Sequence, residues 1–336
     1  MIKLAVDAMG GDNAPSEIVM GVNLAIKKHE DLEIVLYGDK EQIEKYLEKN
    51  DRVSIVHTPY KLDMGEKNPV MAIRGNKELS LVKAFSAVHD KECNGAVTCG
   101  PTQCVVVGAH MIVKKLPGMQ RVALAPSLPC VGGKSRMICD VGANVELKPE
   151  HIEQITLFAS TFLKKTRGVE NPLVGLLNIG VEPGKGREQD RETFKVLTEN
   201  PNINFYGNVE PTEILNTPCD LLVNDGFSGN LITKTIEGTA KAIGQLLKEN
   251  IKSSLGGKIG YLFMRKNLAR FKKILSSDEV GGSLLFGVDG VIVKAHGSSK
   301  AYAVSRAIEL CMEGVNGGYI ETMRKYLEEE TNTENK

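Results

Sequence analysis

The chain of 336 residues carries 42 Lys+Arg and 42 Asp+Glu, and 42% of its residues are hydrophobic. The zero net charge argues against nucleic-acid binding through a basic face, and seven cysteines without a Cys-x-x-Cys pair exclude a disulfide framework and a structural zinc site. No apolar run suits a signal peptide or a membrane span, so we expect a cytoplasmic protein with reduced thiols.

Short apolar runs alternate with amphipathic stretches along the chain. The runs lie at residues 2–6, 32–37, 53–57, 95–98, 137–141, 173–178, 203–206, 221–224 and 290–294. Runs this short that end at Gly, Asp, Asn, Thr or another polar residue are typical of buried parallel strands. Residues 14–29, with Pro15 near their start, repeat apolar side chains at helical spacing. The alternation predicts a doubly wound α/β fold.

Polar, glycine-rich loops follow seven of these predicted strands. They lie at residues 7–13, 99–102, 140–144, 178–182, 207–210, 224–230 and 294–299. In open α/β sheets, ligands bind outside the carboxyl ends of the strands. Each loop alone is also explained by ordinary turn chemistry. Together they predict a ligand-binding rim on one edge of the sheet.

The segment 251–277 is strongly basic, although the whole chain is balanced. It has seven basic residues and no acidic one, with apolar residues between them. If it is helical, an apolar stripe lies beside a cationic face, which suits an anionic membrane surface or an acidic partner. A buried apolar face with solvated lysines is the alternative. Gly256, Gly257 and Gly260 are expected to break the segment into two helical pieces that form a hairpin. We call residues 236–277, which include the basic segment, the flap.

Several familiar catalytic motifs are missing from the sequence. The strings Gly-x-Gly-x-x-Gly, Gly-x4-Gly-Lys-Ser/Thr, His-Glu-x-x-His and Gly-x-Ser-x-Gly do not occur. The sequence therefore argues against a classical NAD- or ATP-binding protein, a zinc hydrolase and a serine hydrolase. Lys185, Arg187, Lys294 and His296 lie close to glycines, where exposed N–H groups and positive charge bind phosphate.

Five stretches carry a more specific pattern. They are Ala-Val-Asp-Ala-Met-Gly-Gly-Asp at 5–12, Asp-Val-Gly-Ala-Asn at 140–144, Gly-Leu-Leu-Asn-Ile-Gly at 175–180, Asp-Gly-Phe-Ser-Gly-Asn at 225–230 and Lys-Ala-His-Gly-Ser-Ser at 294–299. Together they resemble the bacterial phosphate acyltransferase family of phospholipid synthesis (PlsX) over nearly the whole chain. The resemblance implies transfer of a fatty acyl group from acyl-[acyl carrier protein] to inorganic phosphate, giving acyl phosphate for phosphatidic acid synthesis.

The same resemblance implies further properties. The fold would be a three-layer α/β/α sandwich with a mostly parallel sheet, like isocitrate dehydrogenases and phosphate acetyltransferases, and the protein would be a homodimer. It would associate peripherally with the membrane and supply a membrane glycerol-3-phosphate acyltransferase. No cofactor and no metal is expected. One catalytic domain would span residues 1–324, including the flap, with a polar tail at 325–336.

The implied chemistry guides the choice of site residues. Phosphate is already anionic and a thiolate leaves readily, so the site must mainly hold two anions and stabilise an oxyanion. Lys185 and Asn230 are the expected catalytic residues. The expected phosphate- or substrate-binding residues are Gly10, Gly11, Asn144, Lys294, His296, Ser298 and Ser299.

Each choice has a structural alternative. Lys185 could be a solvated loop lysine, Asn230 a helix N-cap and His296 a structural histidine. Asp7 and Asp140 are more simply read as carboxylates that cap loops.

One loop departs from the pattern of the resembled family. Cys-Gly-Pro-Thr-Gln-Cys at 99–104 stands where that family shows Ala-Gly-Asn-Thr-Gly-Ala. Pro101 removes an amide side chain and a backbone N–H, and Gln103 adds a Cβ where φ above zero could have been used. The departure keeps open a non-catalytic scaffold that recruits carrier protein to the membrane.

Cysteine chemistry offers another alternative. An acyl-enzyme through Cys99, Cys104, Cys130 or Cys139 competes with the simpler reading of these residues as buried small hydrophobes.

The flap supplies the remaining predictions. Leu255, Leu262, Phe263 and Phe271 are expected to insert into a bilayer, while Arg265 and Arg270 would contact the membrane or acidic carrier protein. Among enzymes, the alternative functions for this chain are a coenzyme A-dependent phosphotransacylase and a decarboxylating dehydrogenase that shares the expected fold.

Overall fold

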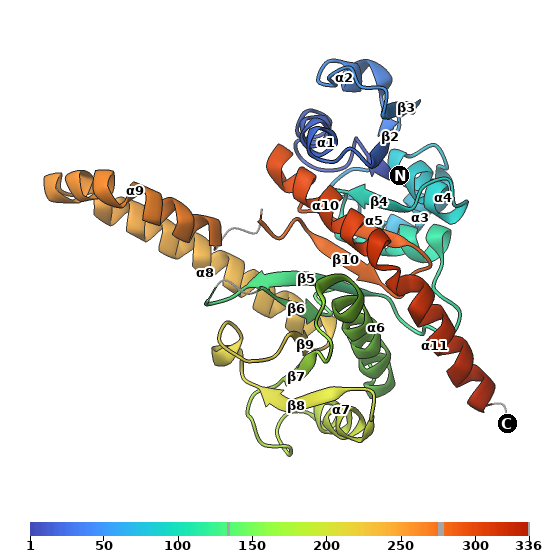
Figure 1. The fold of residues 1–336 in the computed structure, drawn as a ribbon, viewed down its shortest axis with the longest axis vertical. Helices are drawn as coiled ribbons and strands as arrows, with labels where there is room; N and C mark the ends of the chain where they lie inside the picture. The colour runs from blue at the N-terminus through green and yellow to red at the C-terminus, as the bar shows by residue number, and fades with distance from the viewer. Residues whose placement is uncertain (133–134, 275–278, 335–336) are drawn as a thin grey trace.

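A computed structural model of the protein describes residues 1–132, 135–274 and 279–334. Eleven strands form one mixed sheet in the order β3-β2-β1-β4-β11-β10-β5-β6-β9-β7-β8 (Figure 1). The strands are β1 (Ile2–Asp7), β2 (Leu32–Gly38), β3 (Val53–His57), β4 (Gly95–Thr98), β5 (Ala123–Pro129), β6 (Ser135–Cys139), β7 (Leu173–Leu177), β8 (Asn204–Val209), β9 (Leu221–Val223), β10 (Ser283–Phe286) and β11 (Val291–Lys294). The helices are α1 (Ser16–Lys28), α2 (Lys40–Glu44), α3 (Pro69–Gly75), α4 (Ser80–His89), α5 (Thr102–Gly108), η1 (Ala109–Val113), α6 (Pro149–Arg167), α7 (Glu188–Glu199), η2 (Pro211–Glu213), α8 (Gly226–Lys252), α9 (Leu255–Ile274), α10 (Ala301–Gly317) and α11 (Tyr319–Glu334).

Strand direction divides the sheet into two halves. The strands β3, β2, β1, β4 and β11 are parallel to one another, and so are β6, β9, β7 and β8. Between the halves, β10 pairs antiparallel with both β11 and β5, and β5 pairs antiparallel with β6. Three successive reversals leave the second half running opposite to the first. The carboxyl ends of the strands therefore form two loop clusters instead of the single rim expected from the sequence.

The nine runs predicted as strands all form strands, and the two unpredicted strands are β5 and β10. β5 contains Pro126 and Pro129, which argue against a strand because proline has no N–H for the ladder. β10 is only four residues long and follows Gly281 and Gly282, both at positive φ. These two strands supply all three reversals, so the sequence pattern could not reveal the change of direction.

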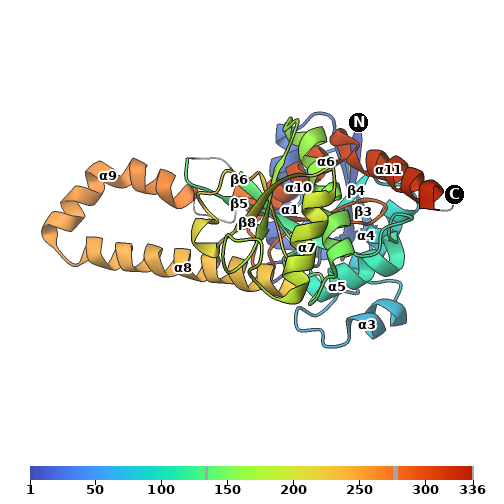
Figure 2. The same ribbon diagram turned by 90° about the horizontal axis from the view of Figure 1, so that it is seen from below.

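Helices cover both faces of the sheet, which confirms the predicted three-layer α/β/α architecture (Figures 1 and 2). α1, α6, α10 and α11 pack on one face with Leu4 of β1, while α4 and α5 pack on the other face with the neighbouring Ala5. On the first face, the ring of Phe158 lies 5.2 Å from that of Phe286 and 5.6 Å from that of Tyr319. The unpredicted β10 thus contributes a central ring to the core.

The flap is a helical hairpin of α8 and α9 that projects from the body (Figure 2). Its turn lies at Ser253 and Ser254, before the three glycines expected to break the helix, which lie inside α9 instead. Ser254 Oγ accepts a hydrogen bond from the N–H of Gly257 at 2.9 Å, so a serine cap starts the second helix. The expected flap boundary at residue 236 falls inside α8, which begins ten residues earlier at Gly226.

Helix ends differ modestly from the sequence expectations. The predicted helix at 14–29 forms α1, with Pro15 at the N-cap instead of the first helical position. The segment from residue 325, expected as a polar tail, continues α11 to Glu334, and Leu327 is only 3% exposed in the core. Among the described residues, no helix combines the length and apolar character needed to cross a bilayer.

Candidate functional site

The first loop cluster joins the carboxyl ends of β1, β4 and β11 (residues 7–13, 98–102 and 294–300). The N–H of Asp12 donates to the carbonyl of Gly297 at 2.8 Å, and Asn13 Nδ2 donates to the carbonyl of Ser298 at 3.0 Å. Gly11 has φ of +105°, and a Cβ there would lie 2.9 Å from the Cβ of Cys99. The same Cβ would lie 3.0 Å from the Gly297 carbonyl oxygen, so close backbone contact between two loops 285 residues apart in sequence explains the glycine at position 11.

The buried carboxylate of Asp7 joins the loops after β1 and β4 through hydrogen bonds. Its side chain is 2% exposed and accepts hydrogen bonds from Thr98 Oγ1 at 2.7 Å and from the N–H of Met9 at 3.2 Å. Thr98 Oγ1 in turn accepts from the N–H of Gly100 at 2.9 Å. Burial raises the pKa of Asp7, against these hydrogen bonds. The loop-capping interpretation of Asp7 fits these contacts.

Lys294 and His296 are two basic side chains of the loop at 294–300. Burial lowers the pKa of Lys294, and nearby Lys234 of α8 adds to the effect. Burial also lowers the pKa of His296, as do Lys294 and Lys234. Two groups whose charged forms oppose each other gain from a bound anion. The arrangement therefore suits phosphate.

His296 presents a defined nitrogen. Its Nδ1 accepts a hydrogen bond from the N–H of Ser298 at 3.2 Å and lies 2.8 Å from Ser298 Oγ. An accepting Nδ1 carries no proton in the neutral ring, so Nε2 is the donating nitrogen. Ser299 is buried, and its N–H donates to the carbonyl of His296 at 3.0 Å. The Lys-Ala-His-Gly-Ser-Ser stretch thus folds as a turn just before α10.

The second loop cluster joins the carboxyl ends of β6, β7 and β9 (residues 140–144, 178–187 and 224–230). Asp140 is fully buried and accepts from the N–H groups of Leu124, Gly142, Ala143 and Asn144 at 2.8 to 3.1 Å. Burial raises its pKa, against these bonds. Asn144 Nδ2 donates to Asp140 at 2.9 Å and to the carbonyl of Val122 at 2.6 Å. The amide and backbone donors of Asn144 are therefore already used within the protein.

Lys185 lies in the loop that follows β7. Its side chain is half exposed, and Nζ lies 4.0 Å from Oε2 of Glu182, a separation that constrains it little. The loop backbone is better held, because Asn178 Nδ2 donates to the Lys185 carbonyl at 3.1 Å and Asn208 Nδ2 to the Glu182 carbonyl at 2.8 Å. Asn178 and Asn208 also bond to each other at 3.2 Å. The sequence reading missed this buried pair, whose signal was an asparagine at the end of two neighbouring strands.

Asn230 is exposed on α8 beside the 140–144 loop. A Cβ at Gly142 would lie 3.4 Å from the Cβ of Asn230. The N-cap of α8 is Asp225, whose Oδ1 accepts from the N–H of Ser228 at 2.7 Å, so the N-cap alternative for Asn230 is wrong. A Cβ at Gly229 would lie well under 3.0 Å from the Asp140 carbonyl. The Gly-Phe-Ser-Gly sequence thus lets α8 touch the loop.

The departing loop at 99–104 folds without strain at Gln103. Pro101 is the N-cap of α5, and Gln103 lies inside that helix, where φ is negative. The positive-φ concern about Gln103 was therefore wrong. Burial raises the pKa of Cys99 to about 12 and of Cys104 to about 11.

All seven cysteines are buried. Burial also raises the pKa of Cys139, and a thiol with a raised pKa is almost wholly protonated and a poor nucleophile at neutral pH, whereas Cys130 is shielded by its burial alone. The structure thus favours the reading of Cys99, Cys104, Cys130 and Cys139 as small buried hydrophobes.

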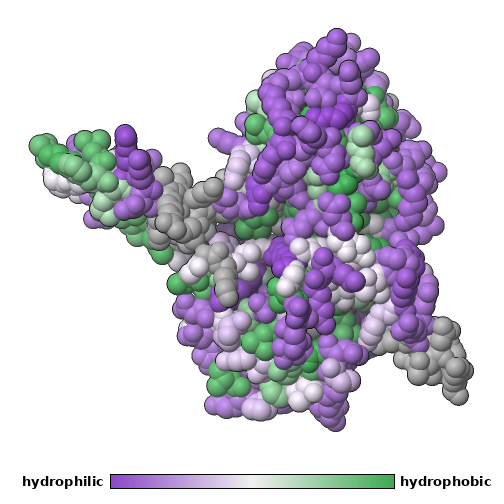
Figure 3. Space-filling view, viewed as in Figure 1, coloured by the Kyte–Doolittle hydropathy of each residue, from purple (hydrophilic) through white to green (hydrophobic). Residues whose placement is uncertain are grey.

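The flap exposes the apolar residues that the sequence singled out. Leu255, Leu262 and Phe263 are 77%, 63% and 85% exposed, and Arg265 is exposed beside them. Figure 3 shows apolar surface at the outer end of the flap. The alternative of a buried apolar face does not hold within this chain. The side chains of Arg270 and Phe271 lie outside the described residues.

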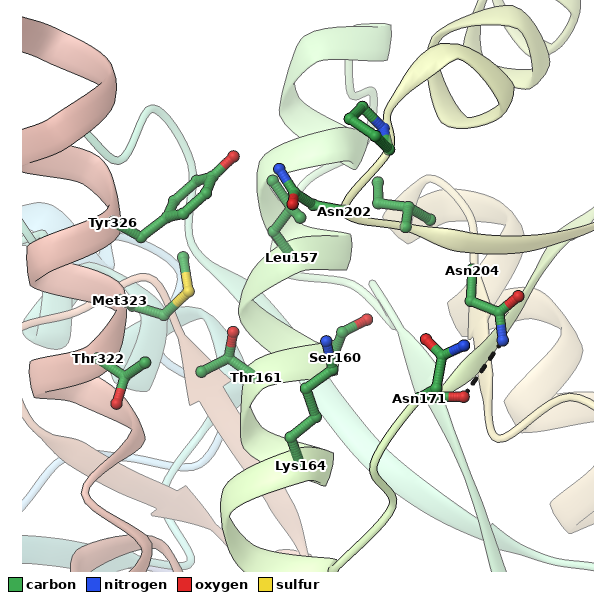
Figure 4. Close-up of a pocket in the computed structure, with 12 residues that line it drawn as sticks. Leu157, Ser160, Thr161, Lys164, Asn171, Asn202, Asn204, Thr322, Met323 and Tyr326 are labelled. Carbon is green, nitrogen blue, oxygen red and sulfur yellow. Dashed lines mark hydrogen bonds between the residues drawn. The ribbon is translucent and has the colours of Figure 1, made fainter.

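A cavity of about 490 Å³ lies away from both loop clusters (Figure 4). It is bounded by α6, α11 and the amino-terminal ends of β7 and β8, with Lys164, Asn171 and Asn204 among its lining residues. The candidate site is at carboxyl ends of strands, so this cavity is not part of it. In the described ranges, no group of three His, Cys, Asp or Glu is placed to hold a metal.

Comparisons with known proteins bear on the family and the fold. Residues 2–322 match the family described as fatty acid synthesis protein. A phosphate acyltransferase of Acholeplasma laidlawii is 46% identical over 310 residues, covering 92% of this chain and 93% of that protein. One from Bacillus cereus is 40% identical over 330 residues, covering 98% and 99%. A solved phosphotransacetylase of Streptococcus pyogenes covers 95% of this chain and 94% of its own with a TM-score of 0.59 at 16% identity, which shows a shared fold.

Proposed function

Because this chain belongs to the phosphate acyltransferase family, and so is an enzyme that transfers acyl groups to phosphate, we propose that its donor is a fatty acyl-[acyl carrier protein]. The product is then an acyl phosphate that enters phosphatidic acid synthesis through a membrane glycerol-3-phosphate acyltransferase. A phosphate oxygen attacks the thioester carbonyl carbon, the C–O bond forms and the C–S bond breaks. The thiolate leaves with the bonding electrons and takes a proton from solvent.

One observation carries the assignment of the site. α8 places Asn230 beside the Gly142 loop and, one turn later, carries Lys234, whose charge contributes to the lowered pKa values of Lys294 and His296. The same helix therefore borders both loop clusters. Phosphate bound by Lys294 and His296 in the first cluster faces a thioester held at the second.

The roles of the side chains follow from their chemistry. The Lys294 ammonium neutralises phosphate and the Nε2–H of His296 donates a hydrogen bond to it, with Ser298, Ser299 and the Gly10 and Gly11 backbone shaping the loop. Lys185 and the Asn230 amide stabilise the oxyanion that develops at the carbonyl, where a preorganised donor lowers the barrier most. Asn144 supports Asp140 instead of contacting substrate, because its donors are used.

The test is phosphate-dependent release of free thiol from palmitoyl-carrier protein, with wild type beside Lys185→Ala. We expect release that needs phosphate and falls about 100-fold or more in the variant, the usual cost of one oxyanion donor. Lys195→Ala, an exposed lysine on α7, is the matched control and should leave the rate unchanged. Faster release from a coenzyme A thioester would favour the coenzyme A-dependent alternative. No release from folded protein would favour the scaffold.

The flap is proposed as the contact with an anionic membrane. Its exposed Leu255, Leu262 and Phe263 suit the acyl boundary, and Arg265 and neighbouring lysines suit anionic headgroups or the acidic carrier protein. The protein would then be cytoplasmic and peripherally attached, and it would release a lipid-like product where it is used.

A homodimer is also proposed. Phe227 and Leu231 lie one turn apart on α8, and Ile243 and Leu246 lie together further along it; all four are exposed, and a second copy of the chain would cover them. Sedimentation of wild type beside Leu231→Glu tests this, since the substitution should yield monomers.

A further inference from the structure

Arg187 connects two elements of the second loop cluster. It follows the Lys185 loop and is the N-cap residue of α7. Its Nη2 lies 2.8 Å from Oδ1 of Asp190 on α7 and 2.6 Å from Oδ2 of Asp225 at the start of α8. Its Nε also donates to Oδ2 of Asp190 at 3.0 Å. One guanidinium thus ties the starts of two helices that begin 38 residues apart.

Asp225 is a buried carboxylate that makes two separate contacts. Its side chain is only 1% exposed, and its other oxygen caps α8 by accepting from the N–H of Ser228. A buried carboxylate of this kind needs a well-oriented cation, and the planar, forked guanidinium can bond two carboxylates at once where an ammonium cannot reproduce the geometry.

The charges around Arg187 argue against direct phosphate binding. One cation lies between two carboxylates, Asp190 and Asp225, so this group has a net negative charge. An incoming phosphate would meet that charge at short range. The contribution of Arg187 must therefore be geometric, although the sequence reading grouped it with the cations that bind phosphate.

What the contact holds in place is informative. Lys185 lies two residues before Arg187, with its carbonyl already bonded by Asn178. Asn230 lies five residues after Asp225, in the second turn of α8. The Arg187–Asp225 contact is therefore a direct tie between the loop of one proposed catalytic residue and the helix of the other.

We propose that Arg187 is a positioning residue that, through Asp225, sets the spacing between Lys185 and Asn230 at the reacting carbonyl. The inference rests on the proposed function, in which those two side chains contact the oxyanion. Misplacement by about 1 Å can cost up to about 100-fold in rate, so a lost tie should lower kcat while leaving substrate affinity largely intact.

The test compares Arg187→Lys with wild type in phosphate-dependent thiol release, alone and combined with Lys185→Ala. Arg167→Lys is the matched control, since Arg167 also joins two helices through a carboxylate, with Nε 3.2 Å from Oε1 of Glu313, far from the site. Asp225→Asn is the second variant, because asparagine still caps a helix but has no negative charge. Thermal unfolding of each variant reports on folding.

We expect Arg187→Lys and Asp225→Asn to lower kcat about 10-fold or more, with the KM for carrier protein within about two-fold and Arg167→Lys close to wild type. In the Lys185→Ala background, Arg187→Lys should change kcat less than about two-fold, because without the Lys185 ammonium there is no spacing between the two groups to preserve. An equal loss in both backgrounds, or no loss in folded Arg187→Lys and Asp225→Asn, overturns the proposal. Wild-type protein without phosphate-dependent release would instead refute the proposed function, which is a separate outcome.

Discussion

Gly229→Ala should destabilise the protein, although the same change in a free helix would stabilise it. In an exposed helix interior, alanine gains roughly 0.5–1 kcal/mol over glycine. A Cβ at Gly229, however, would lie well under 3.0 Å from the Asp140 carbonyl oxygen and from Asn224 Nδ2. Neither is the end of a flexible side chain, because Asn224 Nδ2 is itself bonded to two carbonyls.

The net effect follows from these opposed contributions. Overpacking costs roughly 1–3 kcal/mol, and a backbone obstacle places this site at the upper end. We therefore expect Gly229→Ala to lower the free energy of unfolding by about 2 kcal/mol. It should also reduce turnover, because α8 can relieve the clash only by moving Asn230 away from the 140–144 loop.

Gly238→Ala is the matched control on the same helix. A Cβ at Gly238 meets nothing within 4 Å, so this variant should gain roughly 0.5–1 kcal/mol and keep wild-type turnover. Denaturant titration and the thiol-release assay measure both quantities. If Gly229→Ala proved as stable as Gly238→Ala, the close packing of α8 on Asp140 would be refuted.

Three further predictions concern pH, membrane and thiols. The pKa of His296 is lowered in the folded protein, so below the usual histidine pKa of about 6.5 the unfolded chain binds more protons and the free energy of unfolding falls as the pH drops. His296→Gln should remove part of this fall, which denaturant titrations at pH 7 and pH 5.5 measure. An unchanged difference in stability between the two pH values would contradict the assignment. Leu262→Glu should abolish flotation with anionic vesicles while leaving turnover of soluble substrate unchanged. The control Lys248→Gln changes an exposed residue of the other flap helix and should weaken vesicle binding only slightly. Full vesicle binding by Leu262→Glu would rule out insertion. Iodoacetamide at pH 7 should leave turnover intact because the cysteines are buried and the pKa of Cys99 is about 12; rapid inactivation that substrate prevents would revive the acyl-enzyme.

The sequence was most informative where one local pattern decides the structure. Each of the nine predicted strands is marked in the sequence by a short apolar run, and the basic, apolar-rich composition of residues 251–277 predicted the helical flap. β5 stayed hidden because Pro126 and Pro129 are tolerated there by tertiary pairing, which no local pattern encodes. The turn of the flap was misplaced for a related reason: three glycines looked decisive, yet the cap at Ser254 starts the second helix ahead of them.

Site residues were harder to predict than strands. A motif marks residues that are required, but it does not say whether they touch substrate or hold a neighbour. Asn144 and Asp140 share one motif and bond to each other, and Asn178 and Asn208 form a buried pair that only the fold brings together. Arg187 is the clearest example: the sequence suggested a cation that binds phosphate, but its charge is offset by Asp190 and Asp225.

The unbroken course of α8 constrains how this protein can vary. The helix advances about 100° per residue, so inserting one residue between Asn230 and the turn at Ser253 would swing the outer flap to a different side of the body. Seven inserted residues bring it back to within about 20° of its original facing and lengthen the arm by about 10 Å. Changes in arm length in relatives should therefore come in steps that nearly complete whole turns, such as 7, 11 or 18 residues, so that the phase between the two ends of the helix is kept.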